Sequence, residues 1–291
     1  MADAPARWLV TGAGGQLGLS LLECARAAGI EAHGRDRAGL DIGDPAALAR
    51  ILDVVRPEVV VNAAAFTQVD QCETEHEQAQ RVNAAAPGLL AEACRGRALL
   101  VHVSTDYVFD GEATRPIPEA APLAPLSVYG ESKAAGERAV LASGCEHLIV
   151  RSQWLYGAGR NFVRTILAAA SRGEPLRVVE DQLGRPTATA PLAAAIRGAI
   201  ERECRGTLHL ACEGVASKYD FARAIVREGA RRGLTKEVEV QACASEAFPL
   251  PAARPAYAVL GLERARAQGL ALPHWTDALS GYLDEEQQRR A

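Results

Sequence analysis

The feature that most constrains the fold is a glycine-rich loop near the start of the chain, residues 11–18, which read TGAGGQLG. It lies between a short apolar run and a segment with helical periodicity, and Gly12, Gly15 and Gly18 give it the pattern Gly-x-x-Gly-x-x-Gly. At such a junction the first glycine permits a tight turn, the second lets the backbone approach a pyrophosphate, and the third lets the helix pack closely on the sheet. The N-terminus of the helix then offers free N–H groups to the anion. This position in the chain predicts a dinucleotide-binding site.

The first half of the chain alternates apolar runs with helical patterns. We expect strands at residues 7–11, 30–34, 59–61, 98–103 and 147–151, and helices at residues 17–28, 45–55, 75–95 and 127–142. Asp44 is a plausible N-cap for the second of these helices, with Pro45 at its first position. The alternation predicts an α/β fold with a Rossmann-type, doubly wound parallel sheet covered by helices on both faces.

The pattern loosens after about Tyr156, where glycines and prolines interrupt short elements. We therefore expect residues 1–156 to form a dinucleotide-binding Rossmann domain, and residues 157–291 to form mainly a smaller, discontinuous α/β substrate-binding lobe. The Ala-rich stretch 190–203 is expected to be a helix that packs back on the first domain. Residues 244–255, rich in Ala and Pro, are expected to form a loop, and residues 285–291 form a polar end.

Composition and charge argue against several classes of protein. The net charge of −4 disfavours a nucleic-acid partner, which usually requires a basic surface. No apolar run is long enough to span a membrane, and residues 1–7 lack the apolar core of a signal peptide. The seven cysteines are scattered and the six histidines are dispersed, so neither a disulfide framework nor a metal site is predicted. These features favour a cytoplasmic location.

Residues 33–37, at the end of the second expected strand, read HGRDR. An acidic residue in this region normally binds the ribose 2′-hydroxyl of NADH. Arg35 would instead pair with the 2′-phosphate of NADPH, and Asp36 would still suit NADH. We expect NADPH, with NADH as the alternative, although Arg35 and Arg37 would also fit simple solvated loop charges.

Residues 129–133 read YGESK and contain Tyr-x-x-x-Lys, which puts Tyr129 and Lys133 on one face of a helix. A neighbouring ammonium favours the phenolate and lowers the tyrosine pKa, so we expect Lys133 to make Tyr129 a usable acid–base group near neutral pH. Tyr129 would pass a proton to a carbonyl oxygen as hydride reaches the carbon. Thr105, at the end of a buried strand, would hydrogen-bond the same carbonyl.

These segments together resemble the extended short-chain dehydrogenase/reductases, and within them the dTDP-4-dehydrorhamnose reductase family. The resemblance is carried by residues 11–18, 62–65 (NAAA), 104–109 (STDYVF) and 129–133. Further similar segments are residues 40–42, 67–70, 154–157, 161–162, 181–187 (DQLGRPT) and 254–255, so the resemblance runs from about residue 7 to about residue 283.

The resemblance implies a reaction and a set of site residues. The family reduces the 4-keto group of dTDP-4-dehydro-6-deoxy-L-mannose to give dTDP-L-rhamnose. Its catalytic residues match Thr105, Tyr129 and Lys133. Cofactor contacts are implied for Gly12, Gly15, Gln16, Leu17, Gly18, Arg35, Asp41, Ile42, Ala64, Ala65 and Thr67, together with Tyr129 and Lys133. Contacts with the nucleotide-sugar substrate are implied for Thr105, Asp106, Trp154, Asn161, Arg185 and Arg254, of which the last four also suit plain structural roles.

Two residues depart from the family pattern. Gln153 stands where the family usually has Ser or Ala beside the sugar, which leaves the identity of the sugar open. Some family members form a magnesium-bridged homodimer through glutamates, and Ser20 stands where one of these acids would lie. A homodimer is therefore compatible with the resemblance, but no metal is predicted.

The same fold supports other activities. A dehydratase needs a glutamate after the Thr-Asp pair, and this chain has Tyr107 there. An epimerase, or a ketoreductase for another nucleotide-deoxysugar, stays open. So does a non-catalytic, NADP-binding regulatory subunit, although the intact Thr–Tyr–Lys set argues for catalysis.

Overall fold

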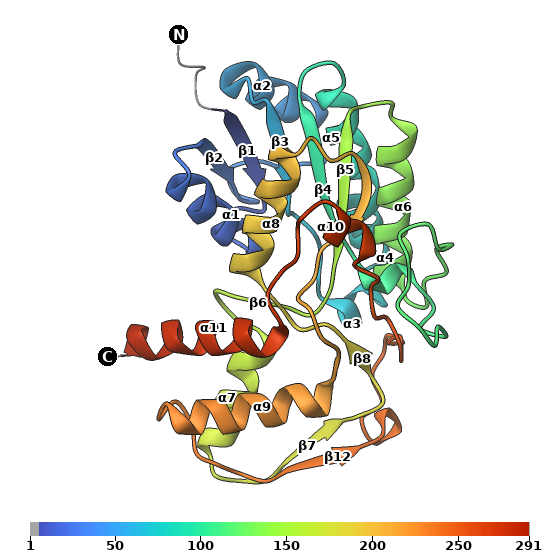
Figure 1. Ribbon diagram of the computed structural model, residues 1–291. Helices are drawn as coiled ribbons and strands as arrows, with labels where there is room; N and C mark the ends of the chain where they lie inside the picture. The colour runs from blue at the N-terminus through green and yellow to red at the C-terminus, as the bar shows by residue number, and fades with distance from the viewer. Residues whose placement is uncertain (1–5, 291) are drawn as a thin grey trace.

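A six-stranded parallel sheet forms the centre of the larger part of the molecule (Figure 1). In the computed structural model, which describes residues 6–290, the strand order is β2–β1–β3–β4–β5–β10. The strands are β1 (Arg7–Thr11), β2 (Glu31–Arg35), β3 (Val59–Asn62), β4 (Leu99–Thr105), β5 (His147–Ser152) and β10 (Gly206–His209). Successive strands are added on one side of β1 and then, from β3 onward, on its other side. Ligands of such sheets bind at the carboxyl ends of the strands beside this switch point. The predicted α/β fold with a Rossmann-type parallel sheet is confirmed.

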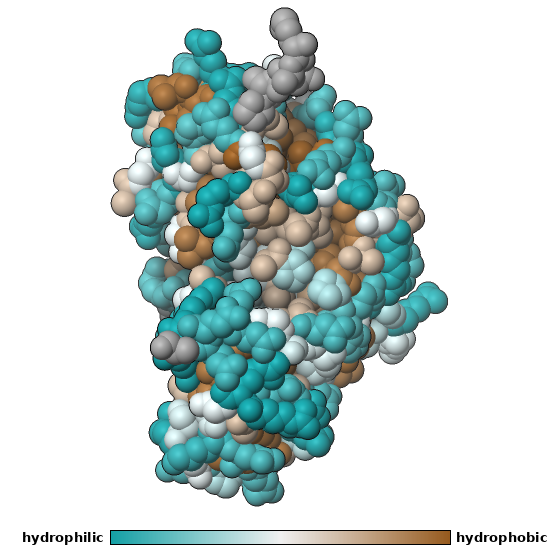
Figure 2. Space-filling model, turned by 60° about the vertical axis from the view of Figure 1, so that its left-hand side comes forward, coloured by the Kyte–Doolittle hydropathy of each residue, from teal (hydrophilic) through white to brown (hydrophobic). Residues whose placement is uncertain are grey.

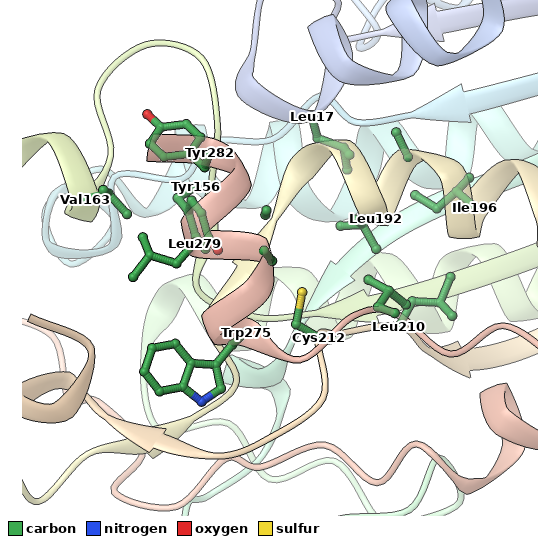
Figure 3. Packing of buried hydrophobic residues seen from close by; sticks show 14 of the residues in the cluster. Leu17, Tyr156, Val163, Leu192, Ile196, Leu210, Cys212, Trp275, Leu279 and Tyr282 are labelled. Carbon is green, nitrogen blue, oxygen red and sulfur yellow. The ribbon is translucent and has the colours of Figure 1, made fainter. Parts of the chain in front are cut away.

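Helices cover both faces of the sheet. One face carries α1 (Gln16–Ala27) and α8 (Thr189–Glu201), and the other carries α2 (Pro45–Val55), α5 (Ala86–Cys94) and α6 (Val128–Ala142). Side chains alternate along a strand, so Val59 and Val61 join the core on the first face while Val60 joins the core on the second. Figure 3 shows Leu17 and Leu192 within the first of these cores.

A smaller lobe lies below the carboxyl edge of the sheet in Figure 1. It contains α7 (Phe162–Ser171), α9 (Lys218–Arg231) and the paired strands β7 (Leu176–Val179) and β12 (Val240–Cys243), and α11 (Trp275–Arg290) packs beside them. Tyr156, Trp275 and Tyr282 gather in the same buried cluster as Leu17 and Leu192 (Figure 3). One continuous apolar core therefore joins the sheet to the smaller lobe.

Short elements connect these parts. They are α3 (Val69–Cys72), α4 (His76–Ala79), the 3₁₀ turns η2 (Asp106–Val108) and η3 (Ser245–Ala247), α10 (Glu263–Ala267), and the two-residue strands β6 (Leu155–Tyr156), β8 (Leu183–Gly184), β9 (Thr187–Ala188) and β11 (Ala216–Ser217).

Several local predictions can be compared with the structure. The predicted helix Pro45–Val55 is confirmed, and the Asp44 carboxylate caps it by accepting hydrogen bonds from the N–H groups of Ala46 and Ala47. The polar residues near the C-terminus are the last turns of α11, where buried Glu286 pairs with Arg164. The start of the chain, for which no signal peptide is expected, falls largely on residues 1–5, outside the described residues.

The predicted helix at residues 75–95 is helical, but its middle is wider than an α-helix. A π-helical segment, η1 (Gln80–Ala85), separates α4 from α5. Pro87 has no N–H to donate to the carbonyl of Asn83, and α6 packs so closely there that a Cβ on Gly136 would lie 2.1 Å from this carbonyl oxygen. The Asn83 side chain donates to Ser132 Oγ of α6, 3.1 Å away. The π segment thus lets α6 approach, and such segments are frequent at functional sites.

Within residues 6–290, no helix is long and apolar enough to cross a lipid bilayer. On the face shown in Figure 2, hydrophilic side chains cover most of the smaller lobe, and apolar ones form separate patches. All seven cysteines are free thiols. In the same described part, no group of three or more His, Cys, Asp or Glu side chains is arranged as metal ligands are.

A buried ion pair fastens α6 to the sheet. The Arg151 guanidinium of β5 donates to both carboxylate oxygens of Glu137, with Nε–Oε1 and Nη2–Oε2 distances of 2.9 and 2.7 Å. Its third nitrogen, Nη1, donates to the Glu119 carbonyl and lies 3.3 Å from His209 Nε2. Burial, followed by the Arg151 charge, lowers the pKa of His209 to about 3, so this imidazole is neutral.

We predict that Glu137→Gln lowers the free energy of unfolding by about 3–5 kcal/mol, because it leaves the Arg151 charge buried without a counter-charge. Urea denaturation at neutral pH measures this. Glu146→Gln is the control, since the Glu146–Arg205 pair is exposed, and its loss should cost under about 1 kcal/mol. Similar losses in the two variants would contradict the role given to the buried pair.

Candidate active site

Four strands end in polar residues at one edge of the sheet. Thr11, Asn62, Thr105 and Ser152 are the last residues of β1, β3, β4 and β5. Thr11 is the register partner of Asn62, and Thr105 is the register partner of Ser152. The hydroxyls and amide that a parallel sheet collects at its carboxyl edge therefore face the crevice where a ligand would bind.

The glycine loop has the backbone geometry that its sequence predicts. Gly12 has a φ of +68°, and a Cβ there would lie 2.6 Å from the carbonyl oxygen of Ala63. A Cβ on Gly18 would lie 2.2 Å from the Gly12 carbonyl oxygen, so α1 starts in close contact with the loop. No side chain caps α1 at Gly15. The first N–H groups of α1 thus fit an anionic ligand such as a pyrophosphate.

Two polar side chains near the carboxyl edge of the sheet each have a buried atom without a partner. Gln16, beside the loop, donates from Nε2 to the carbonyl of Arg160, and its Oε1 is buried without a hydrogen-bond partner in the described part of the chain. Ser152 Oγ, at the end of β5 and separated from β1 by β3 and β4, is likewise buried without a partner there. Buried polar atoms of this kind are normally satisfied, so both suit a crevice that takes a polar ligand.

At the end of β2, the Arg35 side chain is better placed than the Asp36 side chain to bind a ligand. The Asp36 carboxylate accepts the N–H of Gly39 and thus closes its own turn. Arg35 is half-buried and donates only to the carbonyl of Gly34, and no carboxylate within residues 6–290 forms an ion pair with it. A cation held in this way suits a phosphate on the adenosine ribose better than a ribose hydroxyl.

The other residues expected to contact the cofactor differ in burial and in their partners. The Leu17 and Ile42 side chains are buried in the two cores, so only their backbones can contact a ligand. Asp41 is exposed and forms an ion pair with Arg81. Ala64, Ala65 and Thr67 lie in the loop after β3, where the Ala64 N–H donates to Asn62 Oδ1.

Thr105 and Tyr129 meet at the centre of the site. Ser127 caps α6 by accepting the N–H of Gly130, which puts Tyr129 in the first turn of the helix. A Cβ on Gly130 would lie 2.2 Å from the carbonyl oxygen of Tyr107, so α6 packs directly against η2. This contact brings the buried Tyr129 close to Thr105, whose side chain lowers the pKa of Tyr129.

The charge state of Tyr129 differs from the sequence-based prediction. Burial raises the pKa of Tyr129 above its usual range, and the neighbouring Thr105 side chain opposes this only in part. The structure shows no lowering by Lys133, because the Lys133 ammonium donates instead to the carbonyl of Val103, 2.7 Å away. Tyr129 therefore keeps its proton at neutral pH, which is the state that a proton donor requires.

A chain of buried polar groups leads from β1 to Lys133. The backbone N–H of Ala64 and the Thr11 hydroxyl both donate to Asn62 Oδ1, at 3.2 and 2.7 Å. The amide orientation of Asn62 is thereby fixed, and its Nδ2 faces His102 Nδ1 at 3.1 Å. Nδ1 must accept this hydrogen bond, so neutral His102 carries its proton on Nε2.

This tautomer bears on the charge of Lys133. His102 Nε2 lies 3.5 Å from Lys133 Nζ, and an ammonium cannot accept the Nε2 proton whereas a neutral amine can. Burial lowers the pKa of Lys133 to about 8, and the charge of Glu137 on the next turn opposes this. Burial and the His102 proton therefore both favour a lysine that titrates near neutral pH.

The substrate side of the crevice contains a cation that the sequence did not single out. Lys218, the first residue of α9, places Nζ 3.4 Å from the centroid of the Trp154 ring. Trp154 has a φ of 49°, and a Cβ on Gly184 would lie 2.6 Å from its Cε2. The indole is thus held between β8 and Lys218, which restricts the expected stacking of a sugar or base on it.

Asp106 lies next to Thr105 and is almost fully buried. Its Oδ1 accepts from the Thr105 hydroxyl at 3.0 Å and its Oδ2 accepts from Gln153 Nε2 at 3.3 Å. Burial raises its pKa to about 6, while the charge of Lys218 is among the effects that lower it. Gln153 also donates to the carbonyl of Ala258, so it ties this carboxyl to the smaller lobe.

Three residues implied as substrate ligands have protein partners instead. Asn161 caps α7 and donates to the carbonyl of Gly157. The buried Arg185 donates to the carbonyls of Leu260 and Gly214. Arg254 forms a two-pronged ion pair with Asp70. In this structure Asn161 and Arg185 hold loops together, and the Arg254 charge is already balanced by Asp70.

We predict that the Lys133 amine titrates near pH 8, and that His102→Gln raises this midpoint because an amide oxygen can accept from the ammonium. The measurement is a pH titration by NMR of ¹³C-methylated lysine, with the Lys133 signal assigned by its loss in Lys133→Arg. His209→Gln is the control, since His209 is buried beside Arg151 and should leave the midpoint unchanged. A midpoint near the usual lysine value of about 10.4 in the unmodified protein would contradict the prediction.

Comparison with known proteins agrees with this geometry. The family model described as RmlD substrate binding domain matches residues 6–288. The chain is 44% identical over 282 residues to a probable dTDP-4,6-dihydroxy-2-methyloxan-3-one 4-ketoreductase of Streptomyces antibioticus, covering 94% of this chain and 93% of the relative.

Two solved structures are similar over nearly their whole length. A dTDP-4-dehydrorhamnose reductase of Clostridium acetobutylicum has a TM-score of 0.92 and 39% identity, covering 97% of this chain and 99% of the other. That of Bacillus anthracis, in complex with NADP, has a TM-score of 0.91 and 34% identity, covering 97% and 100%. The fold, the Thr–Tyr–Lys set at the sheet edge and these similarities over almost all of the chain show that it belongs to the dTDP-4-dehydrorhamnose reductase family.

Proposed function

We propose that this protein reduces the 4-keto group of a dTDP-linked 4-keto-6-deoxyhexose with NADPH, and that dTDP-4-dehydrorhamnose, which gives dTDP-L-rhamnose, is its substrate. The observation that carries the proposal is the position of the buried, protonated Tyr129 beside Thr105 at the carboxyl edge of the sheet. The names of the similar enzymes from Clostridium acetobutylicum and Bacillus anthracis support it.

The crevice fits a dinucleotide. When bound, NADPH supplies a hydride to the substrate carbon. The loop glycines and the N-terminus of α1 would hold the pyrophosphate, with Gln16 beside them. Arg35 would face the 2′-phosphate, Ala64, Ala65 and Thr67 would line the loop after β3, and Lys133 would hold the nicotinamide ribose. NADH is the alternative cofactor, for which Arg35 would have no phosphate partner.

The residues of the chain would complete the reduction with a proton. Tyr129 donates its phenolic proton to the carbonyl oxygen as that oxygen gains negative charge, so the ketone becomes a secondary alcohol. Thr105 would orient the same oxygen by turning its hydroxyl to it from Asp106, to which the hydroxyl donates in this structure. Lys133 lies one helical turn from Tyr129, and its positive charge would stabilise the phenolate left behind.

A second candidate is a ketoreductase for a different dTDP-deoxysugar. The similarity to the Streptomyces antibioticus enzyme, whose name describes another sugar, favours this alternative, as does Gln153 beside Asp106. An epimerase or a non-catalytic regulatory subunit is less well supported, since a buried, protonated tyrosine at the sheet edge serves reduction directly. The same proposal includes three further points. Residues 1–156 form the dinucleotide-binding domain, and residues 157–291 contribute mainly to a discontinuous substrate-binding lobe. The protein would be a homodimer and would lie in the cytoplasm.

We predict that Tyr129→Phe lowers kcat by roughly 10²–10⁴-fold, because it removes the proton donor. The assay follows NADPH absorbance with dTDP-4-dehydrorhamnose as the substrate. NADPH affinity, measured by fluorescence titration, should stay unchanged, which separates lost catalysis from lost folding. If the variant kept more than about a tenth of the activity, Tyr129 would not be the donor.

We also predict that Arg35→Ser raises the KM for NADPH by roughly 10–100-fold, because a hydrogen-bonded ion pair with the 2′-phosphate is lost. The KM for NADH, which lacks this phosphate, should change less than about twofold. Arg37→Ser is the matched control on the same loop. An equal rise in the KM for NADPH and in the KM for NADH would show that Arg35 does not bind the 2′-phosphate.

A further inference from the structure

We propose that Lys218 and Asp106 together bind the C3 hydroxyl of the sugar, next to the ketone at C4, and thereby select substrates that keep this hydroxyl. This inference rests on the function proposed above and names a specificity-determining pair within the same site. Lys218 comes from α9 of the smaller lobe and Asp106 from η2 at the end of β4, so the pair would close around the sugar from both sides.

The choice of lysine at this position is informative. The chain has 32 lysines and arginines together, but only three are lysines, at positions 133, 218 and 236. Lys236 is exposed on the smaller lobe, and the other two border the crevice. An ammonium is a compact charge with three freely rotating donors, whereas the planar guanidinium suits carboxylates and phosphates. A lysine therefore suits a small acceptor such as a sugar hydroxyl.

Lys218 is held in place without being satisfied by the protein. The Trp154 ring supports the ammonium from one side, but no carboxylate or carbonyl within residues 6–290 accepts a hydrogen bond from it. The nearby Arg254 is occupied by Asp70. Asp106 and Lys218 lie close enough for each charge to shift the pKa of the other, but they form no ion pair within residues 6–290. Burial lowers the pKa of Lys218 to about 7, so its nitrogen carries two or three protons at neutral pH, and these N–H groups are left to a ligand.

Asp106 offers the complementary acceptor beside the reacting group. Each of its oxygens accepts one hydrogen bond from the protein, from Thr105 and from Gln153, and a carboxylate oxygen can accept two. A hydroxyl accepts and donates at once, so it can bridge the ammonium and the carboxylate, which a methylene cannot do. With the carbonyl oxygen between Tyr129 and Thr105, a ring neighbour of C4 would lie beside Asp106, and of the two neighbours only C3 carries a hydroxyl.

The name of one relative describes a compound that fits this pair. The compound named for the Streptomyces antibioticus enzyme, a 4,6-dihydroxy-2-methyloxan-3-one, keeps a hydroxyl next to its ketone and has none on the following carbon. A site that reads only the C3 hydroxyl would accept both this 2-deoxy sugar and the fully hydroxylated one. It would discriminate against a 3-deoxy sugar.

The test compares three dTDP-linked 4-keto-6-deoxyhexoses: the parent sugar, its 2-deoxy form and its 3-deoxy form. Each is assayed by NADPH oxidation with the unmodified enzyme and with Lys218→Met. We expect Lys218→Met to lower kcat/KM for the parent and 2-deoxy sugars by roughly 10–100-fold and to change that for the 3-deoxy sugar by less than about twofold. Lys218→Gln, which retains N–H donors, should recover part of the loss. Lys236→Met is the control and should behave as the unmodified enzyme.

The outcomes separate this inference from the proposed function. If the unmodified enzyme reduces the parent sugar but Lys218→Met slows all three sugars equally, or none of them, the hydroxyl-binding role is overturned and the proposed function stands. If the unmodified enzyme binds NADPH but reduces none of the sugars, the proposed function fails, and this inference fails with it. Thermal melting of each variant shows whether a loss reflects unfolding instead, and Lys218→Gln then carries the comparison.

Discussion

The close seating of α6 on the sheet is the contact on which the site depends. Two glycines make it: Gly130 lies against the backbone of η2, and Gly136 lies against the π segment before α5. Any side chain at either position would push the helix outward. Because Tyr129 and Lys133 are carried by the same helix, the backbone contact at these glycines fixes where both side chains meet the carboxyl edge. The buried pair of Arg151 with Glu137 holds the helix there.

The same burial also sets the protonation of the groups at the site. It keeps the proton on Tyr129, brings the Lys133 titration near neutral pH and raises the pKa of Asp106 to about 6. Each effect follows from the removal of water around a charge, opposed by Thr105 for Tyr129, by Glu137 for Lys133, and by Thr105, Lys218 and Gln153 for Asp106. The protonated tyrosine is thus a result of packing, and a lysine that lies one turn away does not need to create it.

Local rules predicted a large part of this structure. The glycine loop, the buried strands and the helix capped by Asp44 depend on residues that are close together in sequence, where turn, capping and periodicity rules apply. The threonine, tyrosine and lysine that we propose as catalytic were predicted from a spacing and a resemblance. The π segment was missed because periodicity cannot distinguish it from α-helix, although Pro87 within the predicted helix was a signal.

Long-range groups could not be found in this way. Lys218 opens a helix that lies far along the chain from Asp106 and Trp154, and nothing near it in sequence marks it as a site residue. His102 offered a weak signal, as the single polar residue inside the apolar run LLVHV of β4. The contact of His102 with Asn62 depends on the register between β3 and β4, which pairs these two residues. Conversely, Asn161 and Arg185 are polar residues in loops near the site, and only the structure shows their protein partners.

The two halves of the site differ in how they are held, and this difference bears on specificity. The catalytic half is built from strand ends and one helix, fixed by backbone contacts and buried ion pairs. The substrate half reaches the sheet through side chains: Gln153 links Asp106 to the loop at Ala258, and Lys218 lies against Trp154. Side chains can change without moving the backbone. A fold of this kind can therefore keep one reaction while the sugar that it accepts varies with a few residues, as the differing names of its relatives illustrate.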